Sequence, residues 1–258
     1  MCCLLPGVIA TTAASAAASS SPAFGKGESQ QTLILAPYLW APNISGSIGL
    51  AGLRVPLQLS SNLLFKGVNT GGMGYARWQR GDRFAYAEGI FISFGEKSFA
   101  PFFGESVDST LRFGEVGGGV ERRRSLGARG AMTFSPYAGL RYTRLTVDVA
   151  GVLLTTGSKN QWVDPAAGLL LNFPLAGRFD LISKLDVAGF GISSNEYYSA
   201  LAGVNCRLGG PLQVAAGYRW TKAHYRSSGG VNFDLDGRGP LLGLQYSIQR
   251  VRSTILQQ

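Results

Sequence analysis

The feature that most constrains the fold is the alternation in AMTFSPYAGLRYTR, residues 131–144. One set of alternate residues is apolar and consists of Met132, Phe134, Pro136, Ala138, Leu140 and Tyr142. The other set is small or polar and includes Ser135, Arg141 and Thr143. Because successive side chains of an extended chain point to opposite faces, the stretch predicts a strand with one apolar and one polar face.

The same alternation returns later in the chain. In residues 179–187, Phe179, Leu181, Leu185 and Val187 oppose Asp180, Lys184 and Asp186, and residues 212–221 repeat the pattern. Only 15% of residues are charged, against roughly 25% in an average soluble domain. A membrane protein that crosses with strands must close them into a barrel, since open edges leave backbone groups unpaired in lipid. The pattern therefore predicts an all-β fold, a single up-and-down antiparallel transmembrane β-barrel.

Tight and longer connections alternate between the strand-like segments, as in an antiparallel meander. We expect about ten strands, although eight or twelve also fit because the first sixty residues are ambiguous. Pro37 and Pro42 should lie at bulges or at the seam, and Gly239-Pro240 should form a bulge. A helical turn is expected at residues 62–65, capped by Ser60 or Ser61. The expected strands cover residues 31–50, 72–79, 84–94, 109–120, 131–144, 160–173, 178–192, 197–208, 212–225 and 232–248.

The N-terminal segment, residues 1–23, contains no charged residue and ends in the small residues Ser21-Pro22-Ala23. It is typical of a secretory signal peptide, and a disordered Ala/Ser tail is the alternative. Residues 24–258 would then form the barrel domain. Removal of the signal would leave Cys206 as the only cysteine, which excludes an intramolecular disulfide.

Several short motifs resemble a family of uncharacterised Gram-negative outer-membrane β-barrel proteins. In chain order they are Tyr38-Leu39-Trp40-Ala41-Pro42, Ile44-Ser45-Gly46, Trp162-Val163-Asp164-Pro165 with Gly168, Asp186-Val187-Ala188-Gly189-Phe190-Gly191, Gly217-Tyr218-Arg219-Trp220, and Gly239-Pro240 with Leu242-Gly243-Leu244. The resemblance covers most of residues 37–246. It implies a barrel in the cell outer membrane and no particular reaction, and His224 stands where it implies an acidic residue.

Charged residues on the polar face are predicted to line the lumen, because a lone charge facing lipid costs a few kcal/mol at mid-depth. They could form a pore, which the excess of Arg and Lys would make anion-selective. The favoured interpretation is a salt-bridge network that plugs the barrel, since small barrels are just wide enough to be filled by side chains. The predicted lumen-lining residues are Arg77, Glu88, Arg141, Asp164, Lys184, Asp186 and Arg219.

Two further groups are expected at the membrane surfaces. A basic cluster falls at the tight turns and could meet anionic head groups, or be a solvated charge run. Its members are Arg80, Arg83, Arg122, Arg123, Arg124, Arg129, Arg178 and Arg207. Trp78, Tyr142, Tyr218 and Trp220 could form interfacial belts, with ordinary core aromatics as the alternative.

His224, the only histidine, lies near Ser227 and Ser228. It faintly resembles the His/Ser site of lipid A deacylase barrels, but its spacing differs and no acid partner is evident, so an inert loop histidine is the alternative. One His and one remaining Cys argue against a metal site. No phosphate-binding loop or nucleic-acid motif is present, so no cofactor and no nucleic-acid partner are expected.

The sequence thus favours a non-enzymatic outer-membrane barrel, either structural or a narrow passive pore for small solutes, anions among them. A soluble lipocalin-like binding barrel is the first alternative, and a lipid hydrolase that uses His224 is the second. The expected partners are the outer-membrane bilayer with its anionic head groups and the machinery that assembles such barrels. Oligomeric state is left open.

Overall fold

The computed structural model describes residues 30–50, 53–59, 68–94, 106–127, 130–150, 155–192, 196–226 and 232–251. Among these residues no helix is long and apolar enough to span a bilayer. The predicted signal peptide and the predicted helical turn at residues 62–65 lie outside the described residues. The strands are β1 Gln30–Trp40, β2 Asn43–Leu50, β3 Leu53–Leu59, β4 Val68–Arg80, β5 Arg83–Phe94, β6 Ser106–Val120, β7 Arg122–Ser125, β8 Ala131–Ala150, β9 Thr155–Pro174, β10 Phe179–Ala188, β11 Glu196–Gly209, β12 Leu212–Arg226 and β13 Asn232–Val251.

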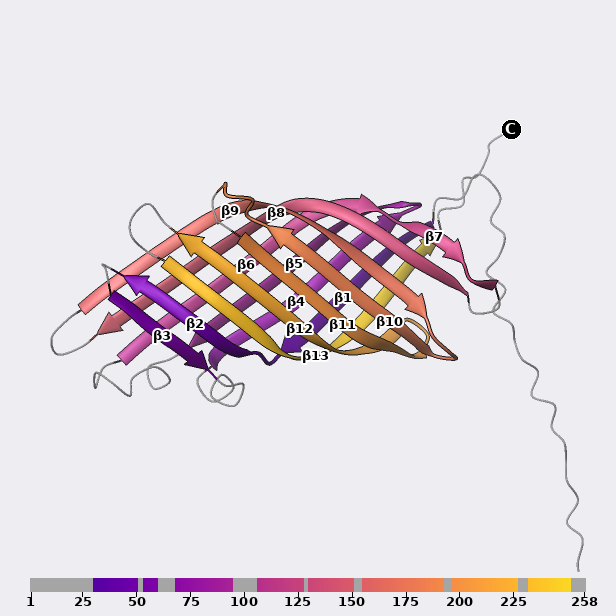
Figure 1. The fold of residues 1–258 in the computed structure, drawn as a ribbon. Helices are drawn as coiled ribbons and strands as arrows, with labels where there is room; N and C mark the ends of the chain where they lie inside the picture. Colours follow the sequence, from indigo (N-terminus) through magenta and orange to yellow (C-terminus); the bar gives the residue numbers. More distant parts are fainter. Residues whose placement is uncertain are drawn as a thin grey trace, which may run out of the picture. The chain divides into compact units, whose positions relative to one another are not determined.

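Ten of these strands form a closed barrel (Figure 1). Around the ring they follow the order β1, β4, β5, β6, β8, β9, β10, β11, β12 and β13, and neighbouring strands run antiparallel. β13 pairs back onto β1 from Gln30↔Val251 to Trp40↔Leu241, which closes the sheet. The prediction of a ten-stranded up-and-down barrel is confirmed. β2 and β3 form an additional hairpin on the edge of β13, and β7 pairs with β8.

The connections define two ends of the barrel. At the end that we call the turn end, β4 and β5 are joined by Gly81-Asp82, and β11 and β12 by Gly210-Pro211. Gly81 and Gly210 in these turns, and Gly177 in the turn between β9 and β10, have positive φ, which glycine adopts without steric cost. We call the opposite end, where β5 ends at Phe94 and β6 begins at Ser106, the loop end. Outer-membrane barrels carry short turns on the periplasmic side and longer loops outside.

The two faces of the wall divide as the alternation predicts. On β8, Leu140 is 56% exposed on the outside, whereas Arg141 next to it is 2% exposed. Val116, Leu185 and Leu242 are further exposed apolar residues on the outer face. A lipocalin-like barrel would have the reverse arrangement. Apolar groups outside and charges inside are the arrangement that a bilayer stabilises.

The alternation is weak along β6 because glycines occupy two of its inward positions, Gly117 and Gly119. A Cβ atom on Gly119 would lie 2.9 Å from Phe84 Cζ, and one on Gly117 would lie 2.8 Å from Tyr86 Cε1. These glycines make room for Phe84, Tyr86 and Tyr137, which pack as a buried aromatic cluster. Tyr86 and Tyr137 meet edge to face with ring centroids 4.9 Å apart, a favourable geometry for aromatic pairs.

Two predictions about irregular positions are decided by the register. The predicted bulge at Gly239-Pro240 is wrong, because β13 pairs with β12 continuously through Tyr218↔Pro240 and Arg219↔Gly239. The apolar–polar alternation appears interrupted there because the next outward residues before Pro240 in the chain, Arg238 and Asp236, are polar. Pro37 and Pro42 do lie at interruptions: Pro37 forms the last β1–β4 pair, and Pro42 lies between β1 and β2.

Candidate functional site

A layer of paired charges crosses the middle of the barrel, with Glu88 at its centre. The Glu88 carboxylate lies 2.5 Å from Lys184 Nζ and 2.9 Å from Arg219 Nη1. The Tyr38 hydroxyl donates a hydrogen bond of 2.7 Å to the same carboxylate. Glu88, Lys184 and Arg219 stand on β5, β10 and β12, which are not neighbours in the sheet. Glu88 therefore ties separate walls together across the lumen.

The other carboxylates of this layer are also paired, although Arg141 Nη1 has no hydrogen-bond partner among the described residues. Arg141 Nε donates to Glu115 Oε2 at 2.7 Å, and the Tyr86 hydroxyl donates to Glu115 Oε1 at 2.8 Å. Asp186 accepts from Lys184 at 3.3 Å and from the Tyr137 hydroxyl. Asp164 is 2% exposed and stands opposite Arg141 in the sheet. We call these residues the charge layer: Tyr38, Glu88, Glu115, Arg141, Asp164, Lys184, Asp186 and Arg219.

Six of the seven predicted lumen-lining residues thus meet in the charge layer. The seventh, Arg77, lies nearer the turn end, where Nη2 binds Glu121 at 2.7 Å and the guanidinium covers the Phe84 ring at 4.0 Å. The sequence interpretation missed Glu115, because its strand is rich in glycine, and it missed Tyr38, Tyr86 and Tyr137 as hydrogen-bond donors to the carboxylates. For Tyr86 and Tyr137 the available signal was their position on the strand faces of Glu88 and Arg141.

Glu121 follows the last residue of β6 at the turn end. Burial raises the pKa of its carboxyl, but hydrogen bonds from Arg123 and Gln79 and the charge of Arg77 outweigh this and hold the pKa below 4.5, its ordinary value. Arg123 Nε lies 2.8 Å from Glu121 Oε1. Glu121 therefore joins the exposed basic cluster to the buried Arg77.

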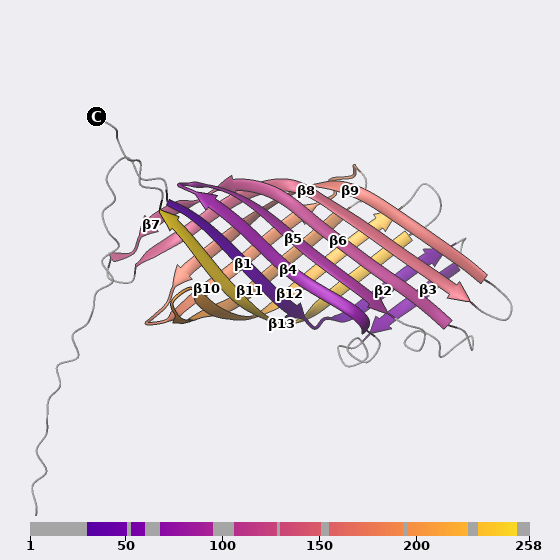
Figure 2. The same ribbon diagram turned by 180° about the vertical axis from the view of Figure 1, so that it is seen from behind.

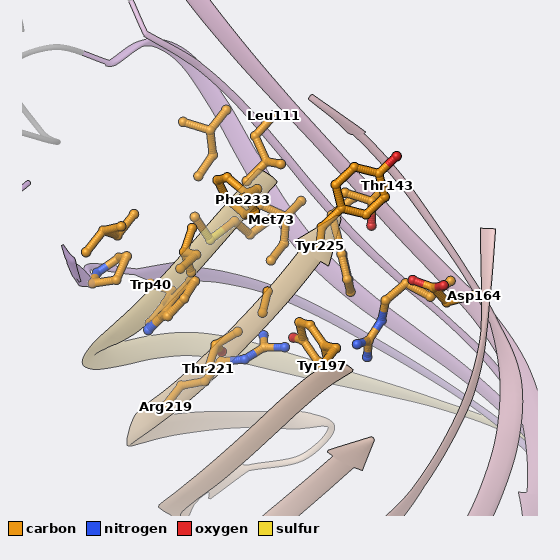
Figure 3. A pocket seen from close by; sticks show the side chains of 18 of the residues that line it. Trp40, Met73, Leu111, Thr143, Asp164, Tyr197, Arg219, Thr221, Tyr225 and Phe233 are labelled. Atoms are coloured by element: carbon orange, nitrogen blue, oxygen red, sulfur yellow. The ribbon is translucent and has the colours of Figure 1, made fainter. Parts of the chain in front are cut away.

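On the loop side of the charge layer lies an apolar cavity of about 320 Å³, here called the chamber (Figure 3). Inward side chains of β5, β6 and β13 supply much of its wall, namely Ile90, Ile92, Leu111, Phe113, Phe233 and Leu235. Trp162 and Tyr225 stack on the wall with centroids 4.1 Å apart. In Figure 3, Arg219, Thr221 and Tyr197 group at one side of the chamber, and Leu111, Met73 and Phe233 group at the other.

Charged residues of the layer, among them Arg141 and Arg219, line the chamber directly, and aromatic rings lie against these two arginines. The Arg141 guanidinium lies 3.6 Å from the centroid of the Tyr197 ring and 5.0 Å from that of Phe113. Arg219 lies 5.5 Å from the Trp40 ring. These cation–π contacts stabilise the cations and present carbon to the chamber. The sequence interpretation expected a polar interior throughout and so missed the chamber, although Ile90 and Ile92 share the strand face of Glu88.

The aromatic and basic residues that the sequence singled out, where described, lie on the outer surface or at the turn end. Trp78, Tyr142 and Trp220 are exposed, and Tyr218 packs against Trp220 with centroids 4.6 Å apart. Arg80, Arg83, Arg122, Arg123, Arg124, Arg178 and Arg207 are exposed, while Arg129 lies outside the described residues. Of these, Arg123 and Arg207 bind buried carboxylates, the latter Asp180 at 3.1 Å. Cys206 is a free thiol.

His224 does have an acid partner, contrary to the sequence interpretation. Its Nδ1 contacts Asp234, the residue opposite it on β13, and Glu196 stands opposite it on β11. Ser47 stands opposite Asp234 and not opposite His224. Ser227 and Ser228 lie outside the described residues. In the part of the chain that the structure describes, no group of three or more metal-ligating side chains is positioned for a metal ion.

No protein-family model matches the chain, and no curated protein matches it in sequence. Among solved structures, it is similar to the outer membrane protease OmpT from Escherichia coli, with 11% identity, 85% of this chain and 97% of that chain covered, and a TM-score of 0.49. It is also similar to a major outer membrane protein from Thermus thermophilus, with 11% identity, 85% and 99% coverage and a TM-score of 0.37. The attachment invasion locus protein Ail of Yersinia pestis gives 10% identity, 84% and 98% coverage and a TM-score of 0.35.

These similarities are too low to carry an argument, so the conclusion depends on the geometry of the chain itself. The sheet is closed by the β1–β13 pairs. Its outer face exposes apolar residues such as Val116 and Leu140, while its charges are paired inside. Because only a bilayer stabilises this arrangement of a closed sheet, the described part of the chain is a ten-stranded transmembrane β-barrel of the outer-membrane type.

Proposed function

We propose that this protein is a non-enzymatic outer-membrane barrel that is closed to free passage of solutes and binds a small apolar molecule in its chamber. The observation that carries the proposal is an apolar cavity of about 320 Å³ that rests on a continuous layer of paired charges. Its assembly would use the general outer-membrane assembly machinery.

The charge layer favours a closed barrel over the narrow anion pore that the sequence left open. Arg141, Arg219 and Lys184 are each bound to a carboxylate, so their charges are already compensated and attract a passing anion less. Opening a water path would leave buried charges unpaired, and breaking a buried pair costs about 3–5 kcal/mol. A closed interior is also expected for a small barrel filled by side chains.

The chamber has the properties of a ligand site. Its volume is at the lower end of the range of about 300–1,000 Å³ that is usual for small-molecule pockets. Its wall is formed by aliphatic and aromatic side chains such as Leu111, Phe113 and Phe233. A small apolar ligand would gain roughly 25 cal/mol for each Å² of apolar surface that it removes from water.

Among the described residues, the surroundings of His224 do not favour a serine-type hydrolase. Such a mechanism needs a hydroxyl within reach of the histidine nitrogen. The residues directly opposite His224 on its two neighbouring strands are Glu196 and Asp234, both acids. Replacement of His224 by Ala should leave any lipid-hydrolysis signal of purified protein at the level of the wild type. A loss of lipid hydrolysis in H224A would instead support the lipid-hydrolase function.

Two measurements test the closed, ligand-binding barrel. The wild type in a planar bilayer should show no stepwise conductance. A small apolar aryl diazirine, photoactivated in nanodiscs, should label inward residues Ile92 and Leu111 saturably, and an excess of unlabelled hydrocarbon should suppress that labelling. Labelling of outward Leu140 should persist under the same excess, because bulk lipid contact does not saturate.

Ala223→Trp and Ala202→Trp form a matched pair for the chamber. Ala223 lines the chamber, whereas Ala202 is exposed on the outer face. A223W should abolish the saturable labelling and A202W should preserve it. Steady single-channel currents, or the absence of saturable inward labelling in the wild type, would overturn the proposal.

A further inference from the structure

The barrel wall is incompletely paired beside the chamber. β1 pairs with β4 from Gln31↔Arg80 to Pro37↔Gly74. Beyond that point β1 stays with β13 as far as Trp40↔Leu241, and β2 then continues along β13 from Asn43↔Arg238. β4 continues with β5 to Val68↔Phe94. Within the described residues, the stretch Val68–Met73 of β4 therefore has a partner on one side only; we call this interval the seam.

The sequence explains why pairing stops there. Pro37 has no N–H to donate to β4, and Pro42 interrupts the chain where β1 passes into β2. β3, the outer strand of the hairpin, pairs with β2 and with no other described strand. Figure 2 shows β1 beside β4, with β2 and β3 continuing beyond the end of β1.

The chamber reaches this seam. Its lining includes the inward Trp40 and also Leu39, which is 62% exposed on the outer face of the same strand. Gly71, Gly72 and Met73 line it from the β4 side. A Cβ atom added to Gly72 would meet no atom within 4 Å. At this place the cavity therefore borders the seam, where β4 has no second partner among the described strands.

We propose that uncharged apolar molecules dissolved in the outer leaflet of the membrane enter the chamber laterally, through the seam. This inference rests on the proposed function and adds the ligand class and its route. Leu39 stands opposite Leu242, another exposed apolar residue of the outer face, so the outer side of the seam is apolar. A solute that passes Leu39 and Met73 moves from acyl chains to the chamber wall without contact with water.

The charge state of the ligand follows from the chamber floor. Arg141 and Arg219 are bound to Glu115 and Glu88, and the rings of Tyr197 and Trp40 lie against their guanidinium groups. An anionic ligand would have to displace one of these carboxylates or use Arg141 Nη1, the guanidinium nitrogen without a hydrogen-bond partner among the described residues. A cationic ligand would have to take a carboxylate from one of these arginines. A neutral solute needs no such exchange.

Bulky substitutions in the seam test the route. If pairing continued in register beyond Pro37↔Gly74, Leu39 would face Gly72. Gly72→Trp should therefore cover the outer mouth of the seam. Gly114→Trp is the matched control, since a Cβ atom on Gly114 also meets no atom within 4 Å and Gly114 lies on β6, away from the seam.

The readout is the rate at which an uncharged aryl diazirine, delivered from lipid vesicles to protein in nanodiscs, begins to label Ile92 and Leu111. G72W should slow this rate at least about tenfold and leave the final extent of labelling near that of the wild type, whereas G114W should change neither. Gly72→Leu serves as a milder second variant and should give an intermediate rate.

The outcomes separate the two proposals. If inward labelling is saturable but G72W and G72L label as fast as the wild type, the lateral route is refuted. The ligand would then enter from the loop end, and the proposed function would stand. If the wild type shows no saturable labelling of Ile92 and Leu111, the proposed function is refuted. Equal labelling by an anionic carboxylate analogue of the probe would refute the neutral ligand class.

Discussion

Arg219 Nη1 lies 2.9 Å from Glu88 Oε1, although 131 residues separate the two in the chain. Lys184 binds the other oxygen of the same carboxylate from a third strand. Two cations on one wall, on β10 and β12, thus share one buried anion on the facing wall. Such a bond holds the walls at a fixed separation, and it depends on the carboxylate being charged.

Replacement of Glu88 by Gln should therefore destabilise the barrel strongly. The change leaves Lys184 and Arg219 buried with less compensation, and removal of one partner from a buried pair costs about 3–5 kcal/mol. The measurement is the urea midpoint of the folded, heat-modifiable band on a gel. Asp82→Asn, at the exposed pair with Arg122 of 3.4 Å, is the control and should shift the midpoint little. The double variant E88Q/K184M should recover part of the stability that E88Q loses. Equal urea midpoints for E88Q and D82N would show that the charge layer does not stabilise the barrel.

The orientation of this site could be predicted from the sequence, but its partners could not. Strict alternation places Leu140 outside and Arg141 inside, because that inference uses only adjacent residues. The Glu88–Arg219 bond joins strands that are not neighbours, so it depends on strand number, tilt and register together. The chamber was missed for a related reason: the inward Ile90, Ile92 and Leu111 resemble ordinary strand residues until the wall beside them is known.

Gly119 should not tolerate a side chain. A Cβ atom there would lie 2.9 Å from both Phe84 Cζ and Tyr137 Cβ, and overpacking a filled interior typically costs about 1–3 kcal/mol. Gly119→Ala should lower the urea midpoint and the yield of folded barrel. Gly114→Ala, on the same strand with no atom within 4 Å, should do neither. A Cβ atom would also clash with the Pro136 carbonyl oxygen, so matching midpoints for the two variants would show that both this backbone and the aromatic cluster can move aside.

A depth series on the outer face of β8 should report the bilayer directly. Ala138, Leu140 and Tyr142 are successive outward residues, and Ala138 lies between Phe134 and Tyr142, the two exposed aromatic residues of that face. Arginine on the lipid face costs about 2–4 kcal/mol at the midplane and about 0–1 kcal/mol near the interfaces. Ala138→Arg should therefore destabilise the barrel in lipid vesicles most, Leu140→Arg less and Tyr142→Arg least. A flat series would contradict a lipid-facing outer surface at this strand.

Glu121 predicts how stability at the turn end responds to acid. Its pKa in the folded protein lies below the ordinary 4.5 because Arg123, Gln79 and Arg77 outweigh the effect of burial. A group with a depressed folded pKa stabilises the fold above its unfolded pKa, and this contribution is lost as the pH falls through the folded value. The urea midpoint of the wild type should thus decrease between pH 5 and pH 3 by more than that of Glu121→Gln, which carries no titrating carboxyl. Because the amide cannot pair with Arg77 and Arg123 as an anion does, E121Q should also be less stable than the wild type at pH 7, and the two should converge in acid. Parallel acid profiles for both proteins would place the acid-sensitive groups elsewhere in the barrel.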